Sequence, residues 1–488
     1  MYEGDNVMNM INVMKKEKLA LLQQPVLLLA VFLSVFLSSP QAFSVNKLLI
    51  INGTMLTMKP GDKPYTGYLL IDENGKIKAI NKGQPSAQYT AESTYDAKGK
   101  IVLPGFISAH SHLSESAFRG LATDQYVYNY PSLKGWVGSL FEHESGAKAE
   151  DYYWFTLQGA LDHLIHGITS VYNFTVNKDK NQKFATWQWR AELDSGIRFI
   201  HSFEPQEGAS FEERKANLET FLEDAKKDST RPTVLRMAYS GWLRKPEAFK
   251  WDANLTQQHH LYSEIHFLES PVNKKMQQDA FKYVKAEKML GTDVSFGHFI
   301  HVNDAILKTV ATSGSGMIWN PMSNGRLASG IVDIPAYQKM GIKIGMGVDG
   351  EGSADLPDPF ENMRTGLYFI RAKYESAKIL QPIDVLRFHT LGSAEVLGVA
   401  DKVGSLEEGK YGDVLIIDPA LVERGPVRDP YAAVVLSCNA MNIAKVYVGG
   451  DLLVDTYKLQ KQDMKQVSHE VNHRVAGLGQ VIMAQADT

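Results

Sequence analysis

The sequence of 488 residues contains a single cysteine, Cys438. One cysteine excludes an intramolecular disulfide, a cysteine-rich zinc site and an iron–sulfur cluster. Any metal that the protein binds must therefore be held by histidines and carboxylates. The sequence also lacks an excess of either charge, because 51 Lys and Arg residues oppose 55 Asp and Glu residues, which gives a net charge of −4. This balance excludes a broadly basic nucleic-acid binder and a polycationic membrane-surface protein, so we expect no nucleic-acid partner.

Internal repeats, low-complexity tracts and long runs of one charge are absent from the sequence. Hydrophobic residues make up 44% and charged residues 22% of the chain, which is ordinary for a globular protein and excludes a disordered one. No glycine-rich phosphate-binding fingerprint follows any predicted strand. The length is about three times that of a typical domain, so only a large barrel could accommodate it as one domain.

The first 44 residues have the three-part form of a secretory signal peptide. Three lysines between residues 15 and 18 precede a 12-residue apolar run, 26–37, and small residues follow. This run is shorter than the roughly 20 residues that span a bilayer. We therefore expect cleavage near residues 42–44, export to the periplasm or out of the cell, and no stable membrane span after cleavage. An uncleaved anchor, or an over-extended gene start upstream of Met14, would also fit.

Both ends of the mature chain have the texture of short strands. Early examples are 48–52, 67–72 and 77–80, broken by Asn-Gly pairs, and later ones are 413–418 and 445–448. These segments predict one small β-sandwich domain built from residues 45–103 and 399–460. Residues 461–488 are predicted to form a helical tail.

The middle of the chain alternates short apolar runs with longer amphipathic stretches. The eight strand candidates are 105–110, 168–174, 197–203, 233–239, 262–268, 294–300, 316–320 and 342–348. Helix-like patterns lie between them, as in 151–166 and 274–290. Eight such units between residues 104 and 398 predict an α/β protein with a (β/α)₈ TIM barrel, which typically takes about 250 residues. A doubly wound open sheet is the alternative.

Histidines and one aspartate follow the predicted strands at the positions where a barrel carries its active site. His110 and His112 lie two residues apart, which places both imidazoles on one face of the first strand. His266 ends the fifth strand, His298 the sixth and Asp349 the eighth. Because active sites of TIM barrels lie at the C-terminal ends of the strands, these side chains are expected to converge on one mouth. Each histidine taken alone is as well explained by a core position.

Several further stretches form a recognisable pattern: 103–107 before the His-x-His pair, Arg119-Gly120, 263–269, 297–301, 320–324, 348–350 and 404–413. In these stretches the sequence resembles the amidohydrolase superfamily, over residues 46 to about 455. It is most similar to the branch of the chlorohydrolases and the cytosine, guanine and S-adenosylhomocysteine deaminases.

The resemblance implies a role for each of the converging side chains. Proteins of that branch hold the metal with side chains from strands one, five and eight, so the resemblance implies His110, His112, His266 and Asp349 as the ligands. His298 is expected to contact the attacking water or the substrate, and Glu269, three residues after His266, to shuttle protons, while Asp349 also accepts the water's proton. Relatives are often dimers or larger, so a homo-oligomer is a further expectation.

The number and kind of metal follow from the fourth strand. Binuclear relatives use a bridging lysine or glutamate there, but residues 233–240 contain neither. We therefore expect one divalent cation, Zn²⁺ rather than Fe²⁺, although ligand chemistry alone does not separate the two. A divalent cation lowers the pKa of a bound water to about 7.

Residues around the expected site predict its pocket. Trp136, in the loop after strand one, and Arg119 are candidates for substrate binding, with side-chain packing and an ion pair as the respective alternatives. The segment 239–242 contains Tyr and Trp where many relatives have a His or a hydroxyl pair, which predicts a more aromatic pocket. The segment 351–355 also departs from relatives, which argues against a standard purine or adenosyl substrate. Glu264 is expected to support the barrel base, and His301 to lie behind the site or on the surface.

The leading functional hypothesis is hydrolytic deamination of a nitrogen heterocycle, a small-molecule substrate. The alternatives are hydrolysis of another C–N, C–Cl or C–S bond, or of an exported cyclic or acyl amide or a dipeptide. A third possibility is a non-catalytic metal-binding protein. Glu269 argues against the last, because metal storage needs no proton shuttle.

Overall fold

The computed structural model describes residues 45–178, 181–241, 243–420 and 427–486. The segment predicted to be a signal peptide, residues 1–44, lies outside the described residues. Within the described part, no helix combines the length and apolar character needed to cross a bilayer.

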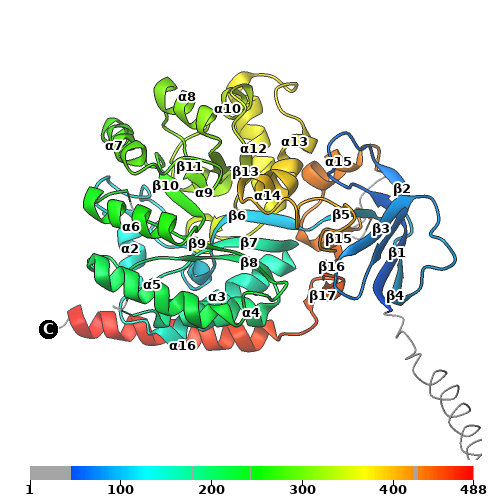
Figure 1. The fold of residues 1–488 in the computed structure, drawn as a ribbon, viewed down its shortest axis with the longest axis horizontal. Helices are drawn as coiled ribbons and strands as arrows, with labels where there is room; N and C mark the ends of the chain where they lie inside the picture. The colour runs from blue at the N-terminus through cyan, green and yellow to red at the C-terminus, as the bar shows by residue number, and fades with distance from the viewer. Residues whose placement is uncertain (1–44, 179–180, 242, 421–426, 487–488) are drawn as a thin grey trace, which may run out of the picture. The chain divides into compact units, whose positions relative to one another are not determined.

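Parallel strands form the central barrel, with helices around it (Figure 1). One sheet has the order β14-β6-β7-β8-β9 and the other β10-β11-β12-β13. A bridge between Ala238 and Tyr262 connects β9 to β10, and β14 follows β13 in the chain, so the two sheets close into one cylinder. The strands are β6 (Phe106–His112), β7 (Ile168–Phe174), β8 (Arg198–Phe203), β9 (Val234–Tyr239), β10 (Ser263–Phe267), β11 (Val294–His298), β12 (Gly316–Trp319), β13 (Ile344–Met346) and β14 (Asp349–Gly350).

This arrangement confirms the predicted TIM-barrel class, with one local difference. The eighth predicted strand, 342–348, contains only the short β13, and a separate short strand, β14, follows it at Asp349–Gly350. The backbone N–H of Gly347 still donates to the carbonyl of Trp319, but Asp349 adopts a positive φ of 64°. That left-handed conformation is unusual for a residue with a side chain, and it ends regular strand geometry at the mouth of the barrel.

Helices connect successive strands and cover the barrel. Their N-termini show the local signals that start helices: Ser210 accepts a hydrogen bond from the N–H of Glu213 at the start of α5, and Asn303 does the same for Ile306 at α8. The main helices are α2 (Trp136–His143), α3 (Ala149–Ile165), α4 (Lys183–Ser195), α5 (Phe211–Lys226), α6 (Pro246–Gln258), α7 (Lys274–Ala286), α8 (Asp304–Ser313), α10 (Ile334–Lys339) and α12 (Pro359–Tyr374). Shorter ones include α9 (Pro321–Arg326), α11 (Glu351–Ala354), α13 (Pro382–Arg387) and α14 (Ser393–Val396).

Strands from both ends of the chain form a separate sheet beside the barrel, which we call the terminal sheet. The strands expected to make a β-sandwich belong to a single hydrogen-bonded sheet of order β18-β17-β16-β15-β5-β1-β2-β3, with β4 also paired to β1. The first half of β1 pairs with β4 and its last residues pair with β5. The strands are β1 (Asn46–Met55), β2 (Tyr65–Ile71), β3 (Ile77–Lys82), β4 (Ala91–Asp96), β5 (Ile101–Pro104), β15 (Val414–Ile417), β16 (Ile443–Val448), β17 (Asp451–Asp455) and β18 (Lys458–Leu459).

The last helix, α16 (Met464–Ala486), runs along the outside of the barrel next to α3 (Figure 1). Val467 and Val471 are buried in this contact. Arg474 forms an ion pair with Asp151 at 3.2 Å.

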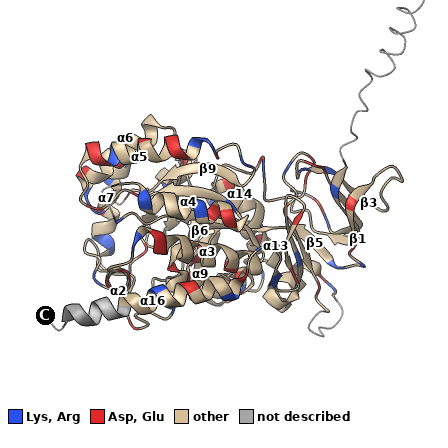
Figure 2. Cartoon of the chain, turned by 90° about the horizontal axis from the view of Figure 1, so that it is seen from below, with Lys and Arg blue, Asp and Glu red and all other residues tan. Residues whose placement is uncertain are grey.

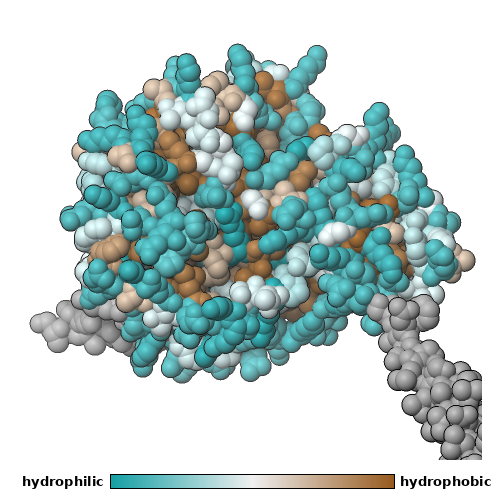
Figure 3. Space-filling view, in the orientation of Figure 1, coloured by the Kyte–Doolittle hydropathy of each residue, from teal (hydrophilic) through white to brown (hydrophobic). Residues whose placement is uncertain are grey.

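Charged residues of both signs are spread over the fold. The cartoon in Figure 2 shows Lys and Arg interspersed with Asp and Glu along the chain, in keeping with a net charge of −4. Figure 3 shows a mainly hydrophilic surface in which hydrophobic residues appear between polar ones.

A buried ion pair joins the barrel to the terminal sheet. Arg198 of β8 donates from Nε and Nη2 to the two carboxylate oxygens of Asp413, at 2.6 and 2.8 Å. The guanidinium also lies 3.8 Å from the centre of the Tyr411 ring. Both charged side chains are buried, and the N–H of Gly449 donates to Asp413 as well. The pair therefore links the barrel to the terminal sheet.

We expect Asp413→Asn to lower the free energy of unfolding by about 3–5 kcal/mol, because it leaves the Arg198 cation buried without its partner. Urea unfolding followed by circular dichroism measures the change. Glu223→Gln is the matched control, since its pair with Lys226 is exposed, and should not change the midpoint. An unaltered midpoint for Asp413→Asn would show that the pair does not stabilise the contact between the barrel and the terminal sheet.

Candidate active site

Four side chains from three parts of the barrel meet at its C-terminal mouth. His110 and His112 lie at the end of β6, His266 in β10 and Asp349 in β14. The Nε2 atoms of His112 and His266 are 3.2 Å apart, and Asp349 Oδ1 lies 3.3 Å from His110 Nε2 and 3.5 Å from His112 Nε2. One ligand atom of each of the three histidines lies within 4.8 Å of the others. The structure thus brings together all four residues that the sequence nominated as metal ligands.

Backbone conformation at the strand ends directs two of the site's side chains. His298, at the end of β11, and Asp349 have φ values of 62° and 64°. Non-glycine residues adopt this left-handed conformation at a cost, and such strain clusters at functional sites. His298 Nε2 lies 3.9 Å from Asp349 Oδ2. Together with His110 these two residues form a second group in which one potential ligand atom of each residue lies within 4.8 Å of the others.

Glu264 determines which nitrogen of His110 faces the cluster. The sequence interpretation placed Glu264 at the barrel base, and the structure corrects this: its Oε1 lies 2.5 Å from His110 Nδ1, with both side chains fully buried. A carboxylate accepts the Nδ1 proton and leaves Nε2 for a cation, as is usual behind a metal-bound histidine. The spacing contains the signal that could have found it, because Glu264 precedes His266 by two residues and so shares its face of the strand.

The donor set fits a divalent cation. His110 Nε2 is buried and has no hydrogen-bond partner within the described structure. Imidazoles and carboxylates are ligands that catalytic zinc sites use, and such a site keeps a position for water or substrate. The residues in β9 add neither a lysine nor a glutamate, so this donor set suits one cation.

The protonation of the histidines also suits metal binding. Burial lowers the pKa of His112 to about 3, helped by the neighbouring His110 charge, and lowers that of His266 well below its usual range. Both imidazoles are thus neutral at pH 7, the form that ligates a metal. Burial alone would lower the pKa of His110, but the Glu264 and Asp349 carboxylates raise it to about 10. A cation at His110 Nε2 replaces that proton, because the two cannot share one lone pair.

Glu269 lies beside the cluster as a buried acid. It follows β10 and is only 2% exposed, and its Oε1 lies 3.4 Å from His298 Nδ1. Burial raises its pKa well above the usual range, and the Asp349 charge raises it further. The opposite holds for Asp349, whose pKa is well below its usual range because the imidazoles outweigh the effect of burial. Burial thus favours the protonated form of Glu269, whereas the imidazoles favour the ionised form of Asp349.

Two asparagines orient His298. The amide nitrogens of Asn324 and Asn320 lie 2.8 and 3.4 Å from its Nδ1 atom. An amide N–H donated to Nδ1 leaves the ring proton on Nε2, which faces Asp349. A protonated Nε2 donates to an oxygen and does not ligate a metal through that atom. This fits the role expected for His298.

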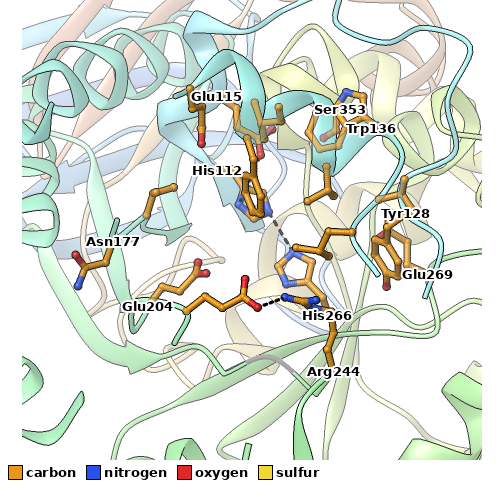
Figure 4. A pocket seen from close by; sticks show the side chains of 18 of the residues that line it. His112, Glu115, Tyr128, Trp136, Asn177, Glu204, Arg244, His266, Glu269 and Ser353 are labelled. Atoms are coloured by element: carbon orange, nitrogen blue, oxygen red, sulfur yellow. Dashed lines mark hydrogen bonds and ion pairs between the residues drawn. The ribbon is translucent and has the colours of Figure 1, made fainter. Parts of the chain in front are cut away.

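A cavity of about 330 Å³ opens next to the cluster (Figure 4). It is lined by His112, His266, Glu269, His298 and Asp349. Its apolar wall comes from α2 and the loop before it, and the residues that form this wall are Val127, Tyr128, Leu133, Trp136, Val137, Leu140 and Phe141. Polar residues from the loops after β7, β8 and β9 complete it. The volume lies at the lower end of the roughly 300–1,000 Å³ of small-molecule sites.

The two candidate substrate-binding residues have different positions. Trp136 lines the cavity, and its buried Nε1 has no partner among the described residues. Arg119 is not among the residues that line it: its guanidinium pairs with Asp162 and with the buried Glu351. The ion-pair alternative therefore describes Arg119 in this structure.

Other residues near the site also have definite positions. His301 Nε2 donates to the carbonyl of Ser329 at 2.7 Å, outside the cluster. Trp242, which was expected to make the pocket more aromatic, lies outside the described residues. The Tyr239 hydroxyl donates to Asp252 at 2.9 Å.

Sequence reasoning missed Glu115, a buried carboxyl that lines the cavity three residues after His112. Its Oε1 lies 3.9 Å from His112 Nδ1. Gly350 leaves room for it, since a Cβ there would overlap the Glu115 carboxylate.

Comparison with known proteins gives consistent matches over almost the whole described chain. The model of the Amidohydrolase family matches residues 101–453. The chain is 26% identical over 441 residues to a 5-methylthioadenosine/S-adenosylhomocysteine deaminase of Desulforamulus reducens, covering 89% of this chain and 99% of that protein. It is 28% identical over 424 residues to a 5′-deoxyadenosine deaminase of Methanobrevibacter smithii, covering 84% and 94%. An adenosine deaminase from Xanthomonas campestris with bound zinc has a TM-score of 0.77 at 20% identity, covering 90% and 99%.

We expect His266→Ala to abolish tight zinc binding, because it removes one of three imidazoles that share the cation. Glu264→Gln should weaken zinc binding by about 10–100-fold, since it removes the carboxylate that fixes the His110 ring. Elemental analysis after dialysis and competition with a chromophoric chelator measure both. His301→Ala is the control that should keep full zinc content. Full occupancy in His266→Ala would remove His266 from the ligand set.

Proposed function

The chain belongs to the amidohydrolase family, and on that premise we propose that it is a zinc-dependent deaminase, which uses water to replace an amino group on a nitrogen heterocycle. The observation that carries the proposal is the position of Glu269. This buried carboxyl lines the cavity beside the metal-ligand cluster. An amine is a poor leaving group unless it is protonated, and a buried acid next to the reacting carbon supplies that proton.

The relatives support this choice of reaction. Two of them, which the chain matches over 84% or more of its length, are named as deaminases of 5-methylthioadenosine, S-adenosylhomocysteine or 5′-deoxyadenosine. A purine-like heterocycle is therefore the substrate class that we propose, against the expectation drawn from segment 351–355. The cavity of about 330 Å³ is lined on one side by Trp136, Tyr128 and aliphatic residues, which suits a planar apolar ring.

His110, His112, His266 and Asp349 would hold the cation. A divalent metal in such a site lowers the pKa of water and so makes hydroxide available at neutral pH. Asp349 accepts the first proton of the water, and the Nε2–H of His298 orients the attacking oxygen.

Glu269 moves the protons on the substrate. It donates to the ring nitrogen next to the carbon under attack, which gives a tetrahedral carbon bearing both oxygen and the amino group. Glu269, now ionised, takes the proton of the added hydroxyl group and passes it to the amino group, and the carbon–nitrogen bond to that group then breaks. The proton held by Asp349 returns to Glu269 and restores the starting state. In net terms, one water proton ends on the ring nitrogen and the other leaves with ammonia, so the products are the ring lactam and NH₃.

The same site could displace chloride or a thiolate from a ring. Those leaving groups depart without a proton, so Glu269 favours an amine. A metal-storing protein would likewise have no use for a buried acid beside the cavity.

We further propose that residues 1–44 direct export to the periplasm. Their three-part sequence pattern supports this. Cell fractionation with N-terminal sequencing tests it, and an intact N-terminus on cytoplasmic protein would contradict it.

An ammonia-release screen tests the reaction type. We expect the zinc-loaded protein to release ammonia from at least one aminopurine, aminopyrimidine, aminopterin or aminotriazine. Chloride release from chlorotriazines and amine release from dipeptides are measured in parallel. Turnover confined to chlorotriazines, acyl amides or dipeptides would contradict the proposal.

We expect Glu269→Gln to lower kcat by about 10²–10⁴-fold and to keep one zinc per chain, because the amide preserves shape but cannot deliver a proton. Steady-state kinetics and metal analysis of the same samples measure both. Glu247→Gln, an exposed glutamate on α6, is the matched control and should be unchanged. Wild-type turnover in Glu269→Gln would exclude Glu269 as the proton shuttle.

A further inference from the structure

Asn177 lines the cavity with a side-chain amide that has no hydrogen-bond partner among the described residues. The residue follows β7 and is 7% exposed. Both its Nδ2 and its Oδ1 are buried without a hydrogen bond within the described structure. Figure 4 shows Asn177 on the side of the cavity away from Glu269 and Tyr128. A buried amide without partners is unfavourable, so this one needs a ligand or water to satisfy it.

The chain on both sides of Asn177 is held in place. The side-chain amide of Gln188 donates to the carbonyl of Val176 at 2.8 Å and accepts from its N–H at 3.2 Å. The carbonyl of Lys178 accepts from the Gln206 side chain at 3.0 Å. The amide of Asn177 is thus presented by a fixed backbone, and a ligand would meet it without reordering the loop.

The cation that follows Asn177 in the chain does not call for an anionic ligand group. The ammonium of Lys178 pairs with the buried carboxylate of Glu144 at 3.0 Å, so its charge is neutralised by the protein. Gln206 adds a carbonyl oxygen, Oε1, that is buried without a hydrogen-bond partner in the described part of the chain. An asparagine amide offers a donor and an acceptor side by side. A group with the complementary pair satisfies both atoms at once.

We propose that Asn177 is a specificity-determining residue that binds an amide-type edge of the substrate, a ring lactam or a carboxamide, on the side of the cavity away from Glu269. Asn177 Oδ1 accepts from the N–H of that edge, and Nδ2 donates to its carbonyl. The inference rests on the proposed deaminase function, which places the reacting carbon beside Glu269. Rings without an adjacent donor and acceptor leave the Asn177 amide unsatisfied and are therefore discriminated against.

Binding to a non-reacting form of the whole protein tests this subsite. The zinc-loaded Glu269→Gln protein is titrated by calorimetry with two matched pairs of rings: isoguanine with adenine, and guanine with 2-aminopurine. Within each pair the amino group is kept and only one member carries the lactam edge. We expect the lactam to bind about tenfold or more tightly in at least one pair.

Two substitutions in that background assign the preference to Asn177. Asn177→Leu should reduce the preference to less than about twofold and leave binding of the ring without the lactam nearly unchanged. Asn177→Asp keeps an acceptor and loses the donor, so it should retain only part of the preference, and it serves if the leucine variant does not fold.

Three results would overturn the proposal: no preference in the parent protein, an unchanged preference in Asn177→Leu, or no binding of either lactam. Failure of the deaminase proposal is seen separately, as absence of ammonia release by the wild-type enzyme. Asn177-dependent lactam binding without ammonia release would uphold the subsite and reject the reaction.

Discussion

The hydrogen bond between His110 Nδ1 and Glu264 is the interaction on which the chemistry of the site depends. It fixes the ring of His110 and leaves its Nε2 directed at Asp349. His110 belongs to β6 and Glu264 to β10, which are separated in the sheet order by three strands. The contact therefore exists only because the barrel closes on itself. The geometry of the metal ligands therefore depends on barrel closure.

The barrel and its loops have separate tasks in this protein. Rigid strand ends carry the ligands, while the loops after β6, β7, β8 and β9 form the cavity wall. Burial then divides the carboxyl groups by function. Asp349 is surrounded by imidazoles and its pKa is lowered, whereas Glu269 is desolvated and its pKa is raised. Two carboxyls in opposite protonation states beside one cavity are what a hydrolysis with proton relay requires.

Sequence reasoning predicted the barrel and nominated the residues that meet at its mouth, because both depend on regular spacing. Alternating apolar runs mark the strands, and the His-x-His pair shares a strand face. It placed Glu264 wrongly, because the partner of that side chain lies 154 residues away in the sequence. It also could not find Asn177, because the burial of an amide without a hydrogen-bond partner among the residues that the structure describes is a property of packing. For Arg119 the sequence allowed either substrate binding or an ion pair, and for Trp136 either substrate binding or packing. Only the surroundings of these side chains in the fold distinguish the alternatives.

Zinc titration of the chelated protein tests the central claim most directly, which is that one cation held by His110, His112, His266 and Asp349 enables the reaction. Bound zinc and turnover are measured together as zinc is added to the chelated full-length protein. We expect turnover to be lost on chelation and to return in proportion to bound zinc, reaching its limit at one zinc per chain. Undiminished turnover after complete chelation would contradict the account.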